Sequence, residues 1–305
     1  MIDGLLVVDK PAGWTSHDVV ARCRKSFGQK RIGHAGTLDP GATGVLLVGL
    51  GRATRLLRFL ADVPKSYVGE VVLGVATSTL DDAGEVVGRW DMGGVSLDQL
   101  REAAAGLTGD LLQVPPMVSA LKVGGRRLHQ LARAGVEVER EPRPVTVYRF
   151  AVTGWADTPE QAGAGVARIE VDCSSGTYVR ALAADLGAAV GGGAHLRRLR
   201  RTAIGPFGEE EALPPDDLGP GCVRDVLDAV RHLVSVVVGP EAAVAVGHGR
   251  PLDRAQLSPA PGDPGDPDPG PGPWAVLDQE GRLLAVYEQA GENGARASVV
   301  MAAHQ

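Results

Sequence analysis

Hydrophobic residues in this chain fall into short blocks whose spacing predicts a mixture of strands and helices. Residues 4–9 and 45–49 are nearly continuous apolar runs, as expected for buried strands, and residues 65–73 alternate between apolar and polar positions. Within residues 177–190 the apolar positions recur at helical spacing, which places Tyr178, Leu182, Leu186 and Ala189 on one face of a predicted helix. The same patterns predict further strands at residues 144–155 and 166–173, and helices at residues 15–27, 53–61 and 96–107.

The order of these elements indicates the fold class. Strands and helices follow one another without a regular strand–helix–strand repeat, so we expect an α+β fold with a mixed, mostly antiparallel central sheet flanked by helices. Thr15 and Asp18 have the spacing of a capping box, which marks the start of the first helix.

A change of composition near residue 238 predicts a second domain. Residues 259–273 are almost entirely Pro, Gly and Asp, and we expect them to form a disordered loop or linker. The apolar runs at 274–278 and 282–288 flank a turn and predict a hairpin. We therefore predict a catalytic domain at residues 1–237 and a small β-rich module at residues 238–305.

Composition excludes several classes of protein. No apolar run approaches the ~20 residues of a membrane span, and Asp3, Asp9 and Lys10 interrupt the first apolar run, so we predict no leader, no membrane partner and a cytoplasmic location. Three cysteines, widely separated, predict neither a disulfide framework nor a zinc site. No nucleotide-binding glycine motif and no clustered His or Cys ligands are present, so we predict no cofactor and no metal.

The net charge of −6 argues against a nucleic-acid partner, but the charge is unevenly spread. Residues 1–60 hold nine Lys or Arg against four Asp or Glu, whereas residues 205–270 hold four against twelve. Residues 195–201 carry four Arg and no acid, and residues 122–143 form another basic segment. An acidic protein can still present a basic face to a phosphate backbone, although such runs are often ordinary solvated surface. Charge alone leaves the two interpretations open.

The stretch from Arg31 to Gly44, RIGHAGTLDPGATG, carries the clearest chemical signal. Its glycines permit positive φ angles or the close approach of another chain. Pro40 keeps Asp39 out of the α region, and an apolar strand follows. A single carboxylate on such a loop suits a catalytic residue. For an isolated Asp-Pro-Gly a structural turn is the commoner explanation, and the other motifs in the chain decide between the two.

Five motifs together closely resemble the TruB family, the bacterial tRNA pseudouridine synthases that modify uridine 55 in the T loop. They are GLLVVDKPAG at residues 4–13, GHAGTLDPGATG at 33–44, KSY at 65–67, VPPMVSALK at 114–122 and GTYVR at 176–180. The resemblance spans residues 4–203 in the family's order. The tail after residue 238 resembles, more loosely, the family's PUA-like RNA-binding module.

The resemblance implies an isomerase that detaches a uracil from its ribose and rejoins it through C5, without a cofactor. Asp39 holds the position of the essential aspartate, which acts as nucleophile or base. Arg180 holds the position of its partner, and a cation there lowers the pKa of a carboxyl group and orients it. Tyr67 matches the aromatic residue that stacks on the flipped uracil, and its phenol can help to remove the C5 proton.

The resemblance also assigns binding and supporting residues. His34 matches a residue that enters the space left by the extruded base, and Tyr178 and Leu199 match residues of the uracil pocket. His34 has a structural alternative as a turn residue, Tyr178 and Leu199 as core residues, and Arg180 as a helix-surface residue. The family's thumb-like insertion corresponds to residues 122–143. Phosphate contacts are predicted for Lys122, Arg126, Arg127, Arg197 and Arg198, and structural support of the loop for Lys10, Pro11 and Pro40.

The predicted partner is the T stem-loop of tRNA, bound by a monomer. Three alternatives stay open at this point: a tRNA-binding chaperone without chemistry, the same chemistry on another RNA such as ribosomal RNA, and an unrelated enzyme acting on a small molecule.

Overall fold

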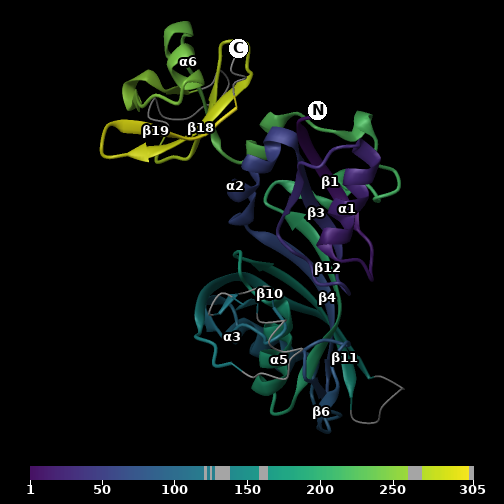
Figure 1. Cartoon of the computed structure of the whole chain (residues 1–305). Coiled ribbons are helices and arrows are strands. Elements are labelled where there is room, and N and C mark those ends of the chain that lie inside the picture. Colours follow the sequence, from purple (N-terminus) through teal and green to yellow (C-terminus); the bar gives the residue numbers. More distant parts are fainter. Residues whose placement is uncertain (120–121, 124–125, 128–137, 158–163, 260–269, 302–305) are drawn as a thin grey trace.

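The computed structural model of the 305-residue chain describes residues 1–119, 122–123, 126–127, 138–157, 164–259 and 270–301. Of residues 122–123 and 126–127, only the backbone is described. The described residues form an elongated body built on a long central sheet, with a smaller β-rich module beside one end of it (Figure 1). The predicted α+β class with a mixed, mostly antiparallel central sheet is confirmed.

The central sheet holds nine of the described strands. In spatial order its main path is β1 (Gly4–Lys10), β3 (Thr43–Leu50), β12 (Ala194–Ile204), β4 (Lys65–Leu73), β11 (Gly165–Cys173), β10 (Arg143–Asp157) and β7 (Gly109–Gln113). β2 (Ile32–Ala35) pairs with β3, and β13 (Phe207–Gly208) pairs with β12. The pair β3–β12 is parallel and the other pairs are antiparallel.

Helices cover both faces of the sheet (Figure 1). Successive side chains of a strand point to opposite faces, and apolar residues on each face pack against helices. α1 (Ser16–Phe27) packs Val19, Val20 and Cys23 against Leu6 and Val8 of β1. Its N-cap is Thr15, and the predicted capping box with Asp18 is present. α3 (Leu97–Gly106) and α5 (Val179–Ala189) pack on β4, β10, β11 and β12 and enclose the largest core cluster.

Shorter elements complete the body. They are η1 (Gly51–Arg55), α2 (Leu57–Ala61), the hairpin β5 (Val75–Thr77) and β6 (Val86–Arg89), the pair β8 (Lys122–Val123) and β9 (Arg126–Arg127), and the single-turn helices η2 (Glu209–Glu211), η3 (Pro220–Cys222) and η4 (Val226–Val230). The predicted helix at 53–61 is divided into η1 and α2 at Leu56, and its predicted inward residues Leu56, Leu57 and Leu60 are buried.

The C-terminal module has its own six-stranded sheet, in the order β15 (Leu252–Asp253), β19 (Gly294–Val300), β18 (Leu283–Ala290), β17 (Trp274–Leu277), β14 (Val234–Val237) and β16 (Ser258–Pro259). α6 (Pro240–Gly247) and η5 (Arg254–Gln256) accompany it. The predicted hairpin is β17–β18. The sheet begins four residues before the predicted boundary at 238, and the domain limits stay a prediction. Most of the predicted Pro/Gly/Asp loop, 260–269, lies outside the described residues.

The module is attached to the body through a shared core and through arginines of η1 and α2. Ala275, Val286 and Met301 join one hydrophobic cluster with Leu5 and Leu47 of the body. The side chains of Arg52 and Arg55 each donate a hydrogen bond of 2.7 Å to a backbone carbonyl of the module, those of Met301 and Val300. Arg58 adds an ion pair of 3.0 Å with Glu288. The module is therefore fixed at the end of the body that carries α2 (Figure 1).

Candidate active site

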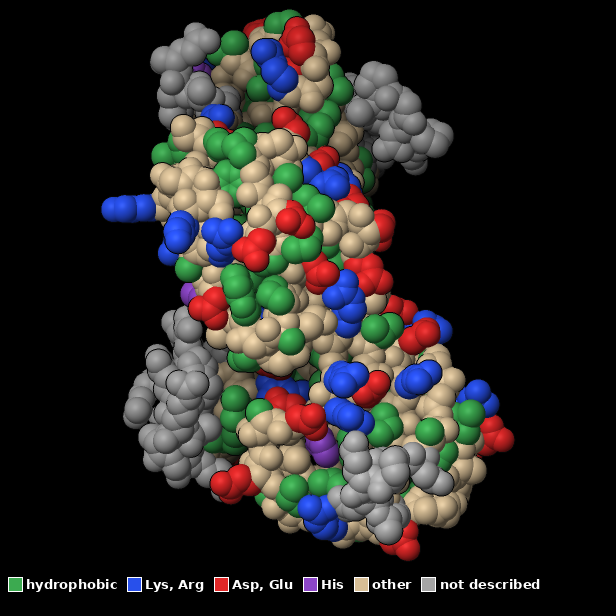
Figure 2. Space-filling view, turned by 90° about the vertical axis from the view of Figure 1, so that its right-hand side faces the viewer, with side chains coloured by type: hydrophobic (Ala, Val, Ile, Leu, Met, Phe, Trp, Pro, Cys, Tyr) green, Lys and Arg blue, Asp and Glu red, His purple; other side chains and the backbone are tan. Residues whose placement is uncertain are grey.

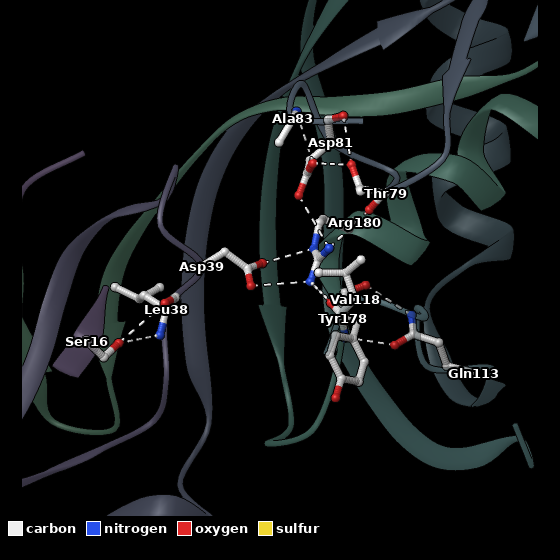
Figure 3. Close-up of polar contacts among 10 residues, drawn as sticks. All are labelled: Ser16, Leu38, Asp39, Thr79, Asp81, Ala83, Gln113, Val118, Tyr178 and Arg180. Atoms are coloured by element: carbon white, nitrogen blue, oxygen red, sulfur yellow. Dashed lines mark hydrogen bonds and ion pairs between the residues drawn. The ribbon is translucent and has the colours of Figure 1, made fainter. Parts of the chain in front are cut away.

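Asp39 lies on the loop of residues 36–42 that connects β2 to β3, called the Asp39 loop below. Ser16 at the start of α1 anchors it, accepting a hydrogen bond of 2.9 Å from Leu38 N (Figure 3). The carbonyl of Pro40 accepts one of 2.8 Å from Gly13 N. The loop is thus fixed on both sides of Asp39, so the carboxylate sits on a rigid support.

Lys10 supports the same loop from beneath. Its side chain is fully buried, and Nζ donates to the carbonyls of Trp14 (2.6 Å), Pro11 (2.9 Å) and Pro40 (3.2 Å). Burial lowers the pKa of Lys10 to about 8, against the opposing attraction of Asp39. The structure thus places Lys10, Pro11 and Pro40 in one hydrogen-bonded group beside Asp39, consistent with the supporting role predicted for them.

We expect Lys10→Met to lower the free energy of unfolding by about 1–3 kcal/mol, because it leaves buried carbonyl acceptors without a donor. The difference has a defined pH dependence. Between about 8, the pKa of Lys10 in the folded chain, and its ordinary value of 10.5, the unfolded chain binds more protons, so the wild type gains stability relative to the variant as pH rises. Urea unfolding of both proteins across this range measures it, and a difference that shrinks with pH contradicts the assignment.

Arg180, in the first turn of α5, holds the Asp39 carboxylate by two contacts. Nε lies 2.9 Å from Oδ2, and Nη2 donates to Oδ1 at 3.3 Å (Figure 3). The same guanidinium donates to the carbonyls of Thr79 (3.0 Å) and Val118 (2.8 Å). Arg180 is 3% exposed. This two-point contact fixes the direction of the carboxylate as well as its charge.

Asp81 is a second carboxylate on Arg180 and did not stand out in the sequence. Its Oδ2 lies 3.3 Å from Nη1 of Arg180, while Oδ1 accepts hydrogen bonds from the Thr79 hydroxyl and from Ala83 N (Figure 3). Asp81 belongs to the turn between β5 and β6, far from Asp39 in the chain. Arg180 therefore lies between two acids, of which Asp39 faces the cavity.

The pKa of Asp39 is raised above its ordinary value of 3.8. Burial is the largest cause and Asp81 adds to it, while Arg180 and Lys10 act in the opposite direction. Arg180 does lower the pKa of Asp39, as expected from the sequence. The effect of burial is larger, however, so the pKa as a whole is raised. The side chain remains 44% exposed, so a ligand can reach it although the protein removes much of its water.

A cavity of about 250 Å³ opens in front of Asp39. Its wall is made by the Asp39 loop, the start of α5 and the inward side chains of β4 and β12; the residues used below are Asp39, Lys65, Tyr67, Tyr178, Leu199 and Arg201. The structure therefore brings together five of the predicted residues, Asp39, Tyr67, Tyr178, Arg180 and Leu199, around one cavity.

The two tyrosines of the cavity are held differently. Tyr67 on β4 is buried, and Arg201 is its directly opposite partner on β12. Tyr178 is the N-cap residue of α5 rather than part of its core face as the helical pattern predicted, and its backbone is bracketed by the Gln113 amide (Figure 3). Burial raises the pKa of both phenols, so both stay protonated near neutral pH.

His34 is not among the residues that line this cavity. It lies on β2, paired with Val48, and its ring meets that of His17 edge to face at 5.3 Å. Burial is the main cause that lowers the pKa of His34 to about 4, and Nδ1 has no hydrogen-bond partner among the described residues. The imidazole is therefore neutral, and its predicted contact with RNA stays a prediction.

None of the predicted phosphate-binding residues whose side chains are described lines the cavity. Arg198 on β12 is exposed and 3.7 Å from Glu70, and Arg197 is partly buried. Lys122, Arg126 and Arg127 fall in the β8–β9 pair, and their side chains lie outside the described residues. On the face in Figure 2, Lys and Arg side chains lie among Asp and Glu and form no continuous basic patch.

Sequence reasoning missed two further cations of the cavity. Lys65 is buried, donates to the carbonyls of Val63 (2.7 Å) and Ala61 (2.9 Å), and has a pKa lowered to about 8, mainly by burial. Arg201 is 1% exposed. Arg201 is the last residue of the basic run 195–201. Such a run is usually interpreted as solvent-exposed surface, so its buried member was not recognised.

Two further observations concern other kinds of site. Within the described ranges, no group of three or more His, Cys, Asp or Glu side chains is arranged to hold a metal ion. No helix of the described chain has the length and apolar character needed to cross a membrane. Cys173 is buried, and burial raises its thiol pKa to about 11.

Comparisons with known proteins show which family this chain resembles. The family model described as "TruB family pseudouridylate synthase (N terminal domain)" matches residues 24–179, and "tRNA pseudouridylate synthase B C-terminal domain" matches residues 180–240. A protein of Rhodococcus jostii (strain RHA1) named tRNA pseudouridine synthase B is 47% identical over 302 residues, which cover 98% of this chain and 93% of the relative. One of the same name from Thermobifida fusca (strain YX) is 45% identical over 294 residues, 94% of this chain and 95% of the relative.

Solved structures share the fold. The crystal structure of a Cbf5-Nop10-Gar1 complex contains a chain that superimposes with a TM-score of 0.70 at 28% identity, covering 97% of this chain and 83% of that one. An H/ACA RNP bound to a substrate RNA containing 2'-deoxyuridine gives a TM-score of 0.69 at 24% identity, covering 98% and 85%. Both matches include the C-terminal module as well as the body.

Proposed function

Because the chain belongs to the TruB family of pseudouridylate synthases, we propose that it converts uridine 55 in the T loop of tRNA to pseudouridine. The observation that carries this proposal is the carboxylate of Asp39, fixed by two contacts with Arg180 at a cavity with room for one extruded nucleoside. Curated relatives that cover nearly the whole chain are named for tRNA as the substrate, which supports the RNA class.

The reaction is an isomerisation, so its atoms balance without a co-substrate. The bond between N1 of uracil and C1′ of ribose breaks, the base turns, and a bond forms between C5 and C1′. C5 then loses a proton and N1 gains one. Asp39 either attacks the nucleoside or removes a proton from it, and both roles need the ionised carboxylate. Arg180 keeps that carboxylate charged and aimed into the cavity.

Tyr67 and Leu199 supply the apolar part of the site. Stacking of a base on an aromatic ring contributes about 1–3 kcal/mol, and the buried ring of Tyr67 lines the cavity on the β4 side. The raised pKa of its phenol favours a group that donates a hydrogen bond, or that passes on a proton with a base beside it, over a free phenolate.

A uridine inside a folded T loop must leave its stack before it can reach Asp39. Unstacking costs a few kcal/mol, and the protein has to offset this with contacts to the base and to the emptied loop. The cavity supplies the first kind of contact. We propose that His34, neutral and outside the cavity wall, supplies the second, and that the basic residues of segment 122–143 and Arg197 and Arg198 contact phosphates.

The proposal is tested with an unmodified tRNA transcript and nucleotide-resolution mapping of pseudouridine. We expect one modified position, uridine 55, and no product from a transcript with cytidine there. A ribosomal RNA transcript of similar length serves as the control for the alternative substrate. A chain that binds the tRNA but leaves every uridine unchanged is instead a binding protein, and the catalytic proposal then fails.

A further inference from the structure

We propose that Arg201 is a positioning residue that holds the Asp39 loop and the Tyr67 ring in one fixed arrangement. The inference rests on the proposed function, because it concerns how the carboxylate and the base-stacking ring are aligned on one nucleoside. Arg201 lines the cavity and lies on β12, the strand between β3 and β4.

The side chain of Arg201 joins the two ends of the Asp39 loop. Nη2 donates a hydrogen bond of 2.7 Å to the carbonyl of Gly36, where the loop begins. Nε donates one of 2.8 Å to the carbonyl of Val45, just after the loop has entered β3. One planar guanidinium thus sets the distance between the two ends of the loop that carries Asp39.

Arg201 and Tyr67 are directly opposite partners on β12 and β4, so their side chains lie side by side on one face of the sheet. Both line the cavity that Asp39 also lines. The charge of Arg201 also opposes, in part, the rise that burial causes in the pKa of Tyr67. The guanidinium that holds the Asp39 loop is thus also the neighbour of the Tyr67 side chain.

The backbone of Arg201 occupies the same junction. It pairs with Gly44 of β3 in the parallel direction and with Tyr67 of β4 in the antiparallel direction. Gly44 has a φ of +100°, and a Cβ there would lie 2.1 Å from the Arg201 carbonyl oxygen. Only glycine allows this approach. Gly36 also has positive φ, +72°, and a Cβ on it would be in ordinary van der Waals contact with Nη1 of Arg201, at 3.4 Å. Gly44 is thus the glycine of the motif that makes room for the Arg201 backbone.

The free-energy cost of burying Arg201 indicates that the residue has a function other than filling the core. It is 1% exposed, and among the described residues no carboxylate forms an ion pair with it. A buried charge without a counter-ion is costly, and an apolar residue would fill the core at lower cost. Lys65 is buried beside it but holds the carbonyls of Ala61 and Val63, outside the Asp39 loop. The bonds to Gly36 and Val45 are therefore particular to Arg201.

The experiment compares Arg201→Met and Arg201→Lys with Arg200→Gln as the matched control. Arg200 is the neighbouring residue on β12 and pairs with Asp9 and Glu209 instead of the loop. For each variant we measure the single-turnover rate of pseudouridine formation on a T-arm hairpin. We also measure the Kd for the same hairpin already carrying pseudouridine, so that binding is separated from chemistry.

We expect Arg201→Met to lower the rate constant about 100-fold, the loss associated with a displacement of about 1 Å between reacting groups, with the Kd changed less than about threefold. Arg201→Lys, which reaches one carbonyl but not both, should fall between Met and wild type. Arg200→Gln should stay within about threefold of wild type on both measures. In the double variant with Tyr67→Phe the losses should be less than multiplicative, because the two side chains are cross-strand neighbours that act on one arrangement of the cavity wall.

Several outcomes overturn the inference while leaving the proposed function intact. These are a near-wild-type rate in Arg201→Met, a loss confined to the Kd, or fully multiplicative losses in the double variant. If Arg201→Met lacks a cooperative unfolding transition, Arg201→Lys provides the same comparison. A wild-type protein that forms no pseudouridine contradicts the proposed function itself. Product at another uridine contradicts only the choice of target, and the comparison is then made on that RNA.

Discussion

Asn in place of Asp39 is expected to reduce pseudouridine formation by about 10⁴-fold or more, while the affinity for the T-arm hairpin stays within about threefold of wild type. The amide cannot act as a nucleophile or base at this position. It has nearly the same size, and its oxygen can still accept one hydrogen bond from Arg180. Arg180 stays held by Asp81 and by the carbonyls of Thr79 and Val118, so the cavity keeps its shape. Release of tritium from C5-labelled uridine in the RNA measures the reaction.

Asp9→Asn is the matched control for this substitution. Asp9 is a carboxylate on the neighbouring strand β1 that pairs with Arg200 at 2.9 Å and does not line the cavity. We expect it to alter the rate less than about threefold, because this ion pair is partly exposed to solvent and lies outside the cavity. Comparable losses in the two variants would mean that Asp39 acts through folding. A wild type and an Asp39→Asn variant that both bind tRNA without product would favour the chaperone alternative.

The catalytic loop was the part of the site most visible in the sequence. Its glycines and Pro40 specify an unusual backbone path, and the structure gives positive φ to Gly36 and Gly44. Local signals of this kind are strong because they act within a few residues. For the same reason the capping box of α1 and the apolar strands β1, β3 and β4 were predicted with nearly the observed limits.

The strand β12 was not predicted because its inward face includes a charged residue. Leu196 and Leu199 face the hydrophobic core, but the next inward-facing residue of the strand is Arg201. The outward-facing positions are also mostly arginines. The alternation of apolar and polar positions that identifies a half-buried strand is therefore lost. A buried arginine that serves backbone carbonyls looks in the sequence like part of an exposed basic run.

Asp81 and the direction of the Asp39 pKa were not predictable for a different reason. Both depend on tertiary structure: Asp81 reaches Arg180 from the β5–β6 turn, and the cost of burial depends on the whole cavity. The sequence pointed to Arg180 as the partner of Asp39. It did not show that Asp81 contacts the same arginine, nor that the cavity removes water from the Asp39 carboxylate. Long-range contacts and desolvation are the parts of a site that local patterns do not encode.

Substitutions at Arg180 and Asp81 are expected to shift the pH dependence of the reaction in opposite directions. The reaction needs ionised Asp39, so the rate falls as pH drops through the pKa of that carboxyl group. Arg180 lowers this pKa and Asp81 raises it. Arg180→Gln should therefore move the acid limb of the rate profile to higher pH, and Asp81→Asn should move it to lower pH. Single-turnover rates across the pH range in which each variant stays folded measure both shifts.

The Arg180 variant also loses rate on the plateau, by about 10²–10³-fold, because the carboxylate is no longer held by the guanidinium. Removing the buried Arg180 side chain also takes the donor from the carbonyls of Thr79 and Val118, which should lower the free energy of unfolding by about 1–3 kcal/mol. Arg180→Lys separates charge from geometry: it keeps the positive charge, so its acid limb should stay near that of the wild type, but it loses the two-point contact and most of the plateau rate. If both acid limbs move in the same direction, then the titrating group that controls the reaction is not Asp39, and the carboxylate on which the proposed chemistry depends must be sought elsewhere in the cavity.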